Sequence, residues 1–220
     1  MGRFVEVCCV SSADVREAAE GGAGRVELCE NLEVGGVTPS RELLEEVMRV
    51  SPIPVNVLVR PRGGDFVFSP EEEAAMVRDI RMCKELGVNG VVIGALRADA
   101  DIDVEMTARL VEEARPLSVT FHRAFDCCRD PFAALEEIIS IGCDRILTSG
   151  QKDSSYDGRE LLARLVEAAA GRIVIMPGGG VRVSNISEIE EVTKAVEFHS
   201  TSRGGSGSTE RGVVAMLVGA

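Results

Sequence analysis

Short apolar runs and amphipathic stretches alternate along the whole chain of 220 residues. The apolar runs are rich in Val and Ile and are bounded by Gly, Pro, Asp or Ser, which is typical of buried strands. Eight of these runs are predicted to be strands: Phe4–Val10, Arg25–Cys29, Ile53–Arg60, Gly90–Gly94, Leu117–His122, Arg145–Thr148, Arg172–Met176 and Ala195–His199.

Amphipathic stretches between these runs predict helices, and several carry start and stop signals. Ser11 or Ser12, Ser69 and Asp130 are suitable N-caps, because their side-chain oxygens can accept from the free N–H groups of a first turn. Gly87 is a suitable end of the long helix before it. The predicted helices are Ser12–Glu20, Ser40–Val50, Pro70–Leu86, Val104–Ala114, Pro131–Ile141, Gly158–Ala170 and Asn185–Val192.

Strands that alternate with helices in this way predict an α/β protein with a parallel sheet. Eight such units in a chain of this length favour a single-domain TIM (β/α)8 barrel over an open doubly wound sheet, and no GxGxxG motif follows the first strand. We expect the barrel over residues 1–203. Residues 204–220 are expected to form a tail or a short, irregular final helix, because Gly207, Gly212 and Gly219 weaken a longer one.

Composition narrows the class of protein. The formal net charge is −12, and there is one Tyr and no Trp, which argues against nucleic acid as a partner. No secretory signal and no apolar run long enough to span a bilayer is seen, so no membrane partner is expected. The seven cysteines lack CxxC spacing, so we expect free thiols in a cytoplasmic, reducing compartment.

Unusual residues collect where the predicted strands end. The first two strands carry Glu6-x-Cys8 and Glu27-x-Cys29, so each acid shares a face of its strand with a thiol. Because a TIM barrel builds its site at the C-terminal strand ends, we expect all of these side chains to converge there. The later strands add further polar residues at the same end: Arg60, Arg62, His122, Arg123, Asp126, Ser149, Gly179, His199 and Ser202.

Each of these groups also has a structural interpretation. Glu6 and Glu27 either contact a ligand or form buried ion pairs with Arg25 or Arg60. Cys8 is either an inert core residue or a metal ligand, and the same holds for Cys29. The glycine-rich loops after the last strands are either turns or cradles for phosphate.

One hypothesis from these residues is an enzyme that acts on a small anionic molecule carrying a phosphate or carboxylate. Its acid and base groups would be Glu6, Glu27, His122 and Asp126. The reaction class stays open, since no nucleophile has an obvious base beside it. In this enzyme hypothesis, the anion would be held by Arg25, Arg60, Arg62, Arg123, Ser149, Gly179, His199 and Ser202.

A further hypothesis is a scaffold that acts through protein partners.

Several long motifs resemble the CutC family, known as copper homeostasis proteins. They are FVEVC, GRVELCENLEVGGVTPS, VLVRPRGGDF, SVTFHRAFD, DRILTSG, RIVIMPGGG and EFHSTSR, and the similarity runs from Glu6 to Arg203. The resemblance implies a cytoplasmic TIM barrel that forms a homodimer or a higher homo-oligomer.

The resemblance also implies a link to copper, with Cu(I) bound through the cysteines at positions 8 and 29. Soft thiolates suit Cu(I), and neighbouring strands lie about 4.8 Å apart, so two such thiols can share one ion. The neighbouring Glu6 and Glu27 would raise the pKa of both thiols unless Arg25 or Arg60 neutralises the acids. Copper binding and the enzyme hypothesis both stay open at this point.

Overall fold

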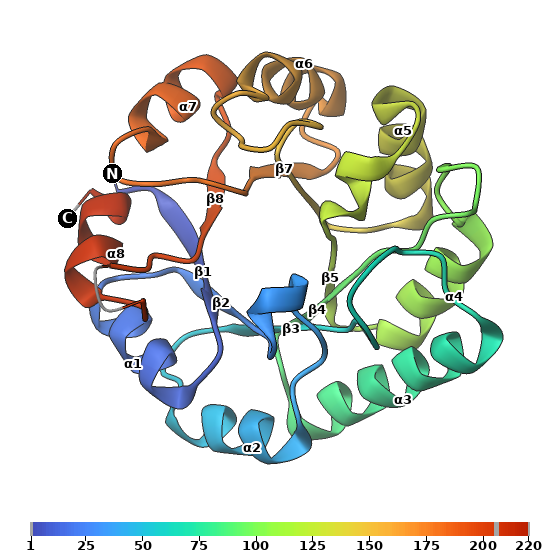
Figure 1. Cartoon of the computed structure of the whole chain (residues 1–220), viewed down its shortest axis with the longest axis horizontal. Helices are drawn as coiled ribbons and strands as arrows, with labels where there is room; N and C mark the ends of the chain where they lie inside the picture. Colours follow the sequence, from blue (N-terminus) through green and yellow to red (C-terminus); the bar gives the residue numbers. More distant parts are fainter. Residues whose placement is uncertain (1, 205–206, 220) are drawn as a thin grey trace.

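Eight parallel strands form the centre of the computed structural model, which describes residues 2–204 and 207–219. Each strand hydrogen-bonds to its neighbour in the order β7-β6-β5-β4-β3-β2-β1-β8, and β7 and β8 contact each other, so the ring is nearly closed. The predicted TIM barrel is confirmed (Figure 1). The strands are β1 Phe4–Cys9, β2 Arg25–Leu28, β3 Val55–Leu58, β4 Gly90–Ile93, β5 Ser118–Phe121, β6 Arg145–Thr148, β7 Val174–Pro177 and β8 Glu197–Ser200.

Helices surround this ring, and their ends follow the predicted caps. The Ser11 side chain accepts from Asp14 N, and Ser69 forms a full capping box with Glu72. Asp130 accepts from two backbone N–H groups of its helix, and Gly87 ends a helix in the left-handed region at φ 73°. The helices are α1 Ser12–Glu20, α2 Arg41–Val50, α3 Pro70–Leu86, α4 Val104–Ala114, α5 Pro131–Ile141, α6 Arg159–Ala169, α7 Ile186–Thr193 and α8 Arg211–Val218.

A short final helix, one of the two alternatives expected for residues 204–220, ends the chain. Helix α8 packs against α1 and β1 and completes the outer ring beside the N-terminus (Figure 1). Gly207 precedes this helix, Gly212 lies in its first turn, and Gly219 is its C-cap at φ 83°. The glycines therefore shorten the helix without preventing it. Residues 205, 206 and 220 of this predicted tail lie outside the described residues.

Side chains along each strand point alternately toward the surrounding helices and into the barrel. Val5, Val7 and Cys9 of β1 pack outward in the main hydrophobic core, between the strands and the helices. Glu6 and Cys8 point the other way, into the barrel. The same parity holds on β2, so the polar residues of both strands lie inside the ring.

Two short 3-10 helices follow strand ends. One, η1 (Leu32–Val34), comes after β2 and is drawn inside the ring near β3 in Figure 1. The other, η2 (Arg123–Cys127), comes after β5. Neither was predicted from the sequence, and both shape the C-terminal face. None of the helices in the described part of the chain has the length and apolar character needed to cross a membrane.

Candidate functional site

A cavity of about 270 Å³ lies at the C-terminal ends of the strands. It is walled partly by apolar side chains, among them Leu58, Phe66 and Leu147. Many residues that the sequence singled out meet here from six different strands or the loops after them. The predicted residues that line the cavity are Cys8, Glu27, Cys29, Arg60, His122, Arg123, Gly179 and His199.

The two predicted thiols form a buried pair at this cavity. Cys8 ends the inward row of β1, and Cys29 directly follows β2. Their sulfur atoms lie 3.6 Å apart, and both residues are buried with Leu58 and Val92 in a small cluster inside the barrel. No cysteine of the described chain is in a disulfide, so the pair is present as two thiols.

The environment of Cys8 favours its protonated form. The hydrogen bond with Cys29, then burial, then the negative charge of Glu27 hold the pKa of the Cys8 thiol well above its usual range. The sequence predicted this direction unless Arg25 or Arg60 neutralised the acids, and Arg25 pairs with Glu6 rather than with Glu27. A ligand that binds this sulfur as a thiolate must therefore displace a proton.

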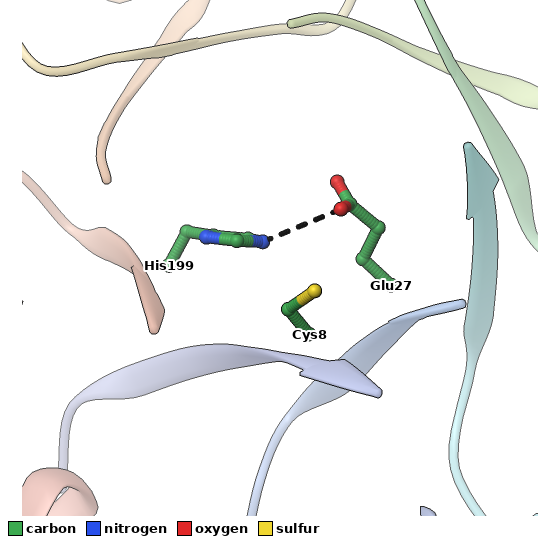
Figure 2. A group of neighbouring side chains, drawn as sticks. All are labelled: Cys8, Glu27 and His199. Carbon is green, nitrogen blue, oxygen red and sulfur yellow. Dashed lines mark ion pairs between the residues drawn. The ribbon is translucent and has the colours of Figure 1, made fainter. Parts of the chain in front are cut away.

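Glu27 and His199 point toward each other beside Cys8 (Figure 2). His199 Nε2 lies 3.6 Å from Glu27 Oε1, and one ligand atom from each of Cys8, Glu27 and His199 falls within 4.8 Å of the others. Burial lowers the pKa of His199, but the carboxylates of Glu27 and Glu6 outweigh it, so the net shift is upward. Within the described residues, His199 Nε2 and Glu27 Oε2 are buried without a hydrogen-bond partner.

Glu6 lies deeper in the barrel and has a different neighbourhood. It is fully buried and ion-paired with Arg25, its direct partner in the parallel ladder, and Asn56 Nδ2 donates to it at 3.2 Å. Arg25 also pairs with Glu197 at 2.8 Å. Glu6 and Arg25 therefore form one of the buried ion pairs that the sequence allowed. Both residues lie below the cavity and do not line it. Glu27 is the carboxylate that faces the cavity among the described residues.

His122 enters the cavity from the end of β5. Its Nδ1 accepts from Ala124 N at 3.1 Å, so the proton of the neutral ring lies on Nε2. Burial and the nearby Arg60 charge lower the pKa of His122 to about 4. Nε2 is buried and has no partner in the described chain. Gly94 gives the ring its space, since a Cβ there would lie 2.5 Å from Nδ1.

Arg60 closes another side of the cavity from the end of β3. Its Nη atoms donate to three backbone oxygens, of Val34 (3.2 Å), Gly36 (3.0 Å) and Gly64 (2.7 Å), and its guanidinium lies 4.8 Å from the centre of the Phe66 ring. It makes no ion pair with a carboxylate of the described chain, and its buried Nε has no partner. Burial and the Arg62 charge lower the pKa of Arg60.

Asp126 and Ser149 form a bonded group beside the cavity and do not line it. Asp126 accepts from Thr148 Oγ1, from the N–H groups of Ser149 and Gln151, and from Arg123 Nε at 2.8 Å. Both carboxylate oxygens of Asp126 are therefore occupied by donors from the end of β6, from the loop after it and from Arg123, away from the cavity. Asp126 thus contacts Arg123 and not the cavity, and its acid–base role stays a prediction.

Two further predicted residues also lie away from the cavity. Arg62 is partly exposed and pairs with Asp65 at 2.9 Å and Glu72 at 2.5 Å. Ser202 lines a shallow hollow next to α8 instead. Both follow a strand end by two residues or more, where loop geometry rather than strand parity sets the direction of a side chain.

Some residues of this face were missed at the sequence level. Arg182 lines the mouth and follows the glycine-rich loop after β7. Inside the barrel, Glu197 connects Arg25 to Arg145, whose Nε lies 2.8 Å from it. The parity of β8 was an available signal, since Glu197 stands two positions before His199 and so shares its face.

Comparison with known proteins identifies the relatives of this chain. The family model described as the CutC family matches residues 3–204. A CutC family protein from Parabacteroides distasonis is 54% identical over 204 residues, covering 92% of this chain and 84% of that protein. The copper homeostasis protein cutC homolog of Homo sapiens is 48% identical over 202 residues, covering 92% of this chain and 74% of that protein.

Solved structures agree with the sequence relatives. The putative copper homeostasis protein CutC from Streptococcus agalactiae superposes with a TM-score of 0.86 at 33% identity, covering 90% of this chain and 98% of that chain. Thiamine phosphate pyrophosphorylase from Pyrococcus furiosus has a TM-score of 0.66 at 16% identity, covers 97% and 93% of the two chains, and shares the fold alone. With a family model matched over residues 3–204 and relatives near half identity, the chain belongs to the CutC family.

Proposed function

We propose that this protein binds Cu(I) as cargo through the thiolates of Cys8 and Cys29, as part of copper homeostasis. The observation that carries the proposal is the buried pair of sulfur atoms 3.6 Å apart, at the floor of a cavity that opens on the C-terminal face. Cu(I) is a soft ion that prefers sulfur ligands, and a buried thiol pair excludes the harder ions that need oxygen and water.

The spacing of the pair is compatible with one shared ion. Metal–thiolate bonds are about 2.3 Å long, so two sulfurs on one ion lie at most about 4.6 Å apart. The observed separation falls inside that range without movement of either strand. Bound copper would replace the thiol protons, including the one in the hydrogen bond between the two sulfurs.

Glu27 and His199 add a negative charge and a nitrogen ligand to the two thiols. A carboxylate that faces the cavity attracts a positive ion, and His199 Nε2 is a further nitrogen donor within reach of Cys8 Sγ. The buried Nε2 and the carboxylate oxygen that now lack partners would gain one when an ion is present.

The cellular setting of the proposal is a reducing cytoplasm, because oxidation of two thiols this close would form a disulfide and remove the ligands. The human and mouse relatives are named copper homeostasis proteins, which supports the general role. The homodimer or higher oligomer expected from the resemblance stays a prediction.

The direct test is an anaerobic titration of the reduced, metal-free protein with Cu(I) against a competing chelator. We expect one ion per chain, with release of thiol protons, because Cys8 is protonated before binding. The apparent affinity should therefore rise between about pH 6 and about pH 8. Uptake without proton release, or an affinity independent of pH, would contradict binding by the thiol pair.

A further inference from the structure

We propose that the cavity above the thiol pair also binds a small organic anion, whose carboxylate or phosphate group accepts hydrogen bonds from Arg60 and His122. The proposal goes beyond copper binding and depends on different residues. It is also the class of ligand expected if the barrel is an enzyme.

The size of the cavity is the first argument. A volume of about 270 Å³ far exceeds that of one ion between two sulfurs. The volume lies just below the size of about 300 Å³ at which small-molecule pockets begin, and such pockets combine apolar walls with a few polar groups. Leu32, Leu58, Phe66, Leu147 and Val181 form such a wall here, so the ligand should have an apolar part as well as a charge.

The unpaired charge of Arg60 is the second argument. The residue is only 5% exposed, and its Nη atoms hold backbone oxygens, which are neutral. A buried cation without a counter-ion is costly, and a ligand anion would supply one. The Nε–H lacks an acceptor in the described chain, so one donor is left for that anion.

His122 supplies a second donor at the same cavity. Its Nδ1 is already an acceptor for Ala124 N, so the neutral ring can only donate through Nε2. That Nε2–H is buried and without a partner in the described residues. Leaving a buried donor unsatisfied costs more than a typical hydrogen bond contributes, and an oxyanion would accept from both donors.

The mouth of the cavity adds positive charge in an acidic chain. Arg182 is exposed and lines the cavity, and no ion pair to its guanidinium is found in the described residues. Arg123 lines it too, although Asp126 balances its charge. A net charge of −12 over the whole chain makes this local excess of arginine a feature of the cavity rather than of the surface in general.

The test is a calorimetric and thermal-shift titration of the metal-free protein with inorganic phosphate, phenyl phosphate and benzoate, against chloride at equal ionic strength. We expect phenyl phosphate or benzoate to stabilise the protein, and to bind more tightly than inorganic phosphate because of the apolar wall. The two aromatic probes distinguish a phosphate ligand from a carboxylate ligand.

Three variants assign the binding to the cavity. Arg60→Gln should weaken the tightest probe at least about tenfold, since a charged hydrogen bond is lost. Arg182→Gln should weaken it about threefold, a smaller effect that suits an exposed charge. Arg97→Gln is the control, because Arg97 follows β4 on the same face but pairs with Asp99 and Asp101 outside the cavity.

Two results would overturn the proposal. One is that no probe stabilises the protein more than chloride does. The other is wild-type binding of the tightest probe by Arg182→Gln, or by an Arg60→Gln variant that folds. Arg60 also donates to three loop carbonyls, so its replacement can disturb folding. Arg182→Gln changes only an exposed side chain and keeps the test decisive in that case.

Discussion

The double variant Cys8→Ser/Cys29→Ser is expected to bind Cu(I) more than about 100-fold more weakly than the wild type, since loss of a group that merely supports a metal ligand already costs about 10-fold to 100-fold. Serine keeps the size of each side chain and removes the soft ligand. The two sulfurs lie 3.6 Å apart, and the double variant removes both of these proposed ligands. Competition with a Cu(I) chelator measures the change.

Cys9→Ser is the matched control for this experiment. Cys9 is adjacent to Cys8 in β1, but its side chain packs in the outer core against the helices. It should lower stability slightly and leave Cu(I) affinity within about twofold, because surface or core changes away from the ligands do not alter the donor set. A double Cys8/Cys29 variant that still binds Cu(I) like the wild type would rule out this pair as the site.

Replacing Arg25 by methionine is expected to lower the free energy of unfolding by about 3–5 kcal/mol, the usual cost of leaving a buried charge without its partner. Glu6 is fully buried and would keep only Asn56 as a hydrogen-bond donor, with His199 Nε2 3.9 Å away. Urea unfolding followed by circular dichroism measures the loss.

Two comparisons separate this effect from a general loss of packing. The double variant Arg25→Met/Glu6→Gln should recover a substantial part of the stability, since it removes the stranded charge as well. Arg81→Met, which breaks an exposed pair with Glu113, should cost less than about 1 kcal/mol. A loss in Arg25→Met no larger than that in Arg81→Met would show that the interior network contributes little.

The ion pairs inside the barrel also explain why Glu6 and Glu27 have different surroundings. Arg25 pairs with Glu6 and Glu197, and Arg145 also pairs with Glu197, so two arginines balance the two carboxylates below the cavity. Glu27, one layer nearer the mouth, lines the cavity and has His199 rather than an arginine as its partner among the described residues. The acid of the Glu-x-Cys pattern thus has a structural role in β1 and faces the cavity in β2, while both cysteines line the cavity.

Much of the fold follows from local signals in the sequence. Ser69 and Gly87 bound α3 as predicted because a capping side chain and a left-handed glycine satisfy backbone groups whatever lies around them. Strand parity predicted that Glu6 and Cys8 share the barrel interior. The short α8 was harder, since Gly212 lowers intrinsic helix propensity and the helix depends on packing against α1 and β1.

Residues beyond the strand ends were harder to predict, because parity stops where the strand stops. Arg60 and Arg62 are two positions apart, yet one turns into the cavity and the other pairs with Glu72 outside it. Asp126 lies in η2, a turn with no clear sequence signal, where the amides after β6 surround it. Such contacts depend on how separate loops meet, which a single sequence does not state.

The central claim is that Cys8 and Cys29 hold one copper ion between them. Crystals of the reduced protein loaded with one equivalent of Cu(I) allow the ion to be located by anomalous scattering at the copper absorption edge. We predict a single peak about 2.3 Å from both sulfur atoms. A peak bound only by histidine or surface carboxylates, or fully loaded protein with no peak between these sulfurs, would contradict the claim.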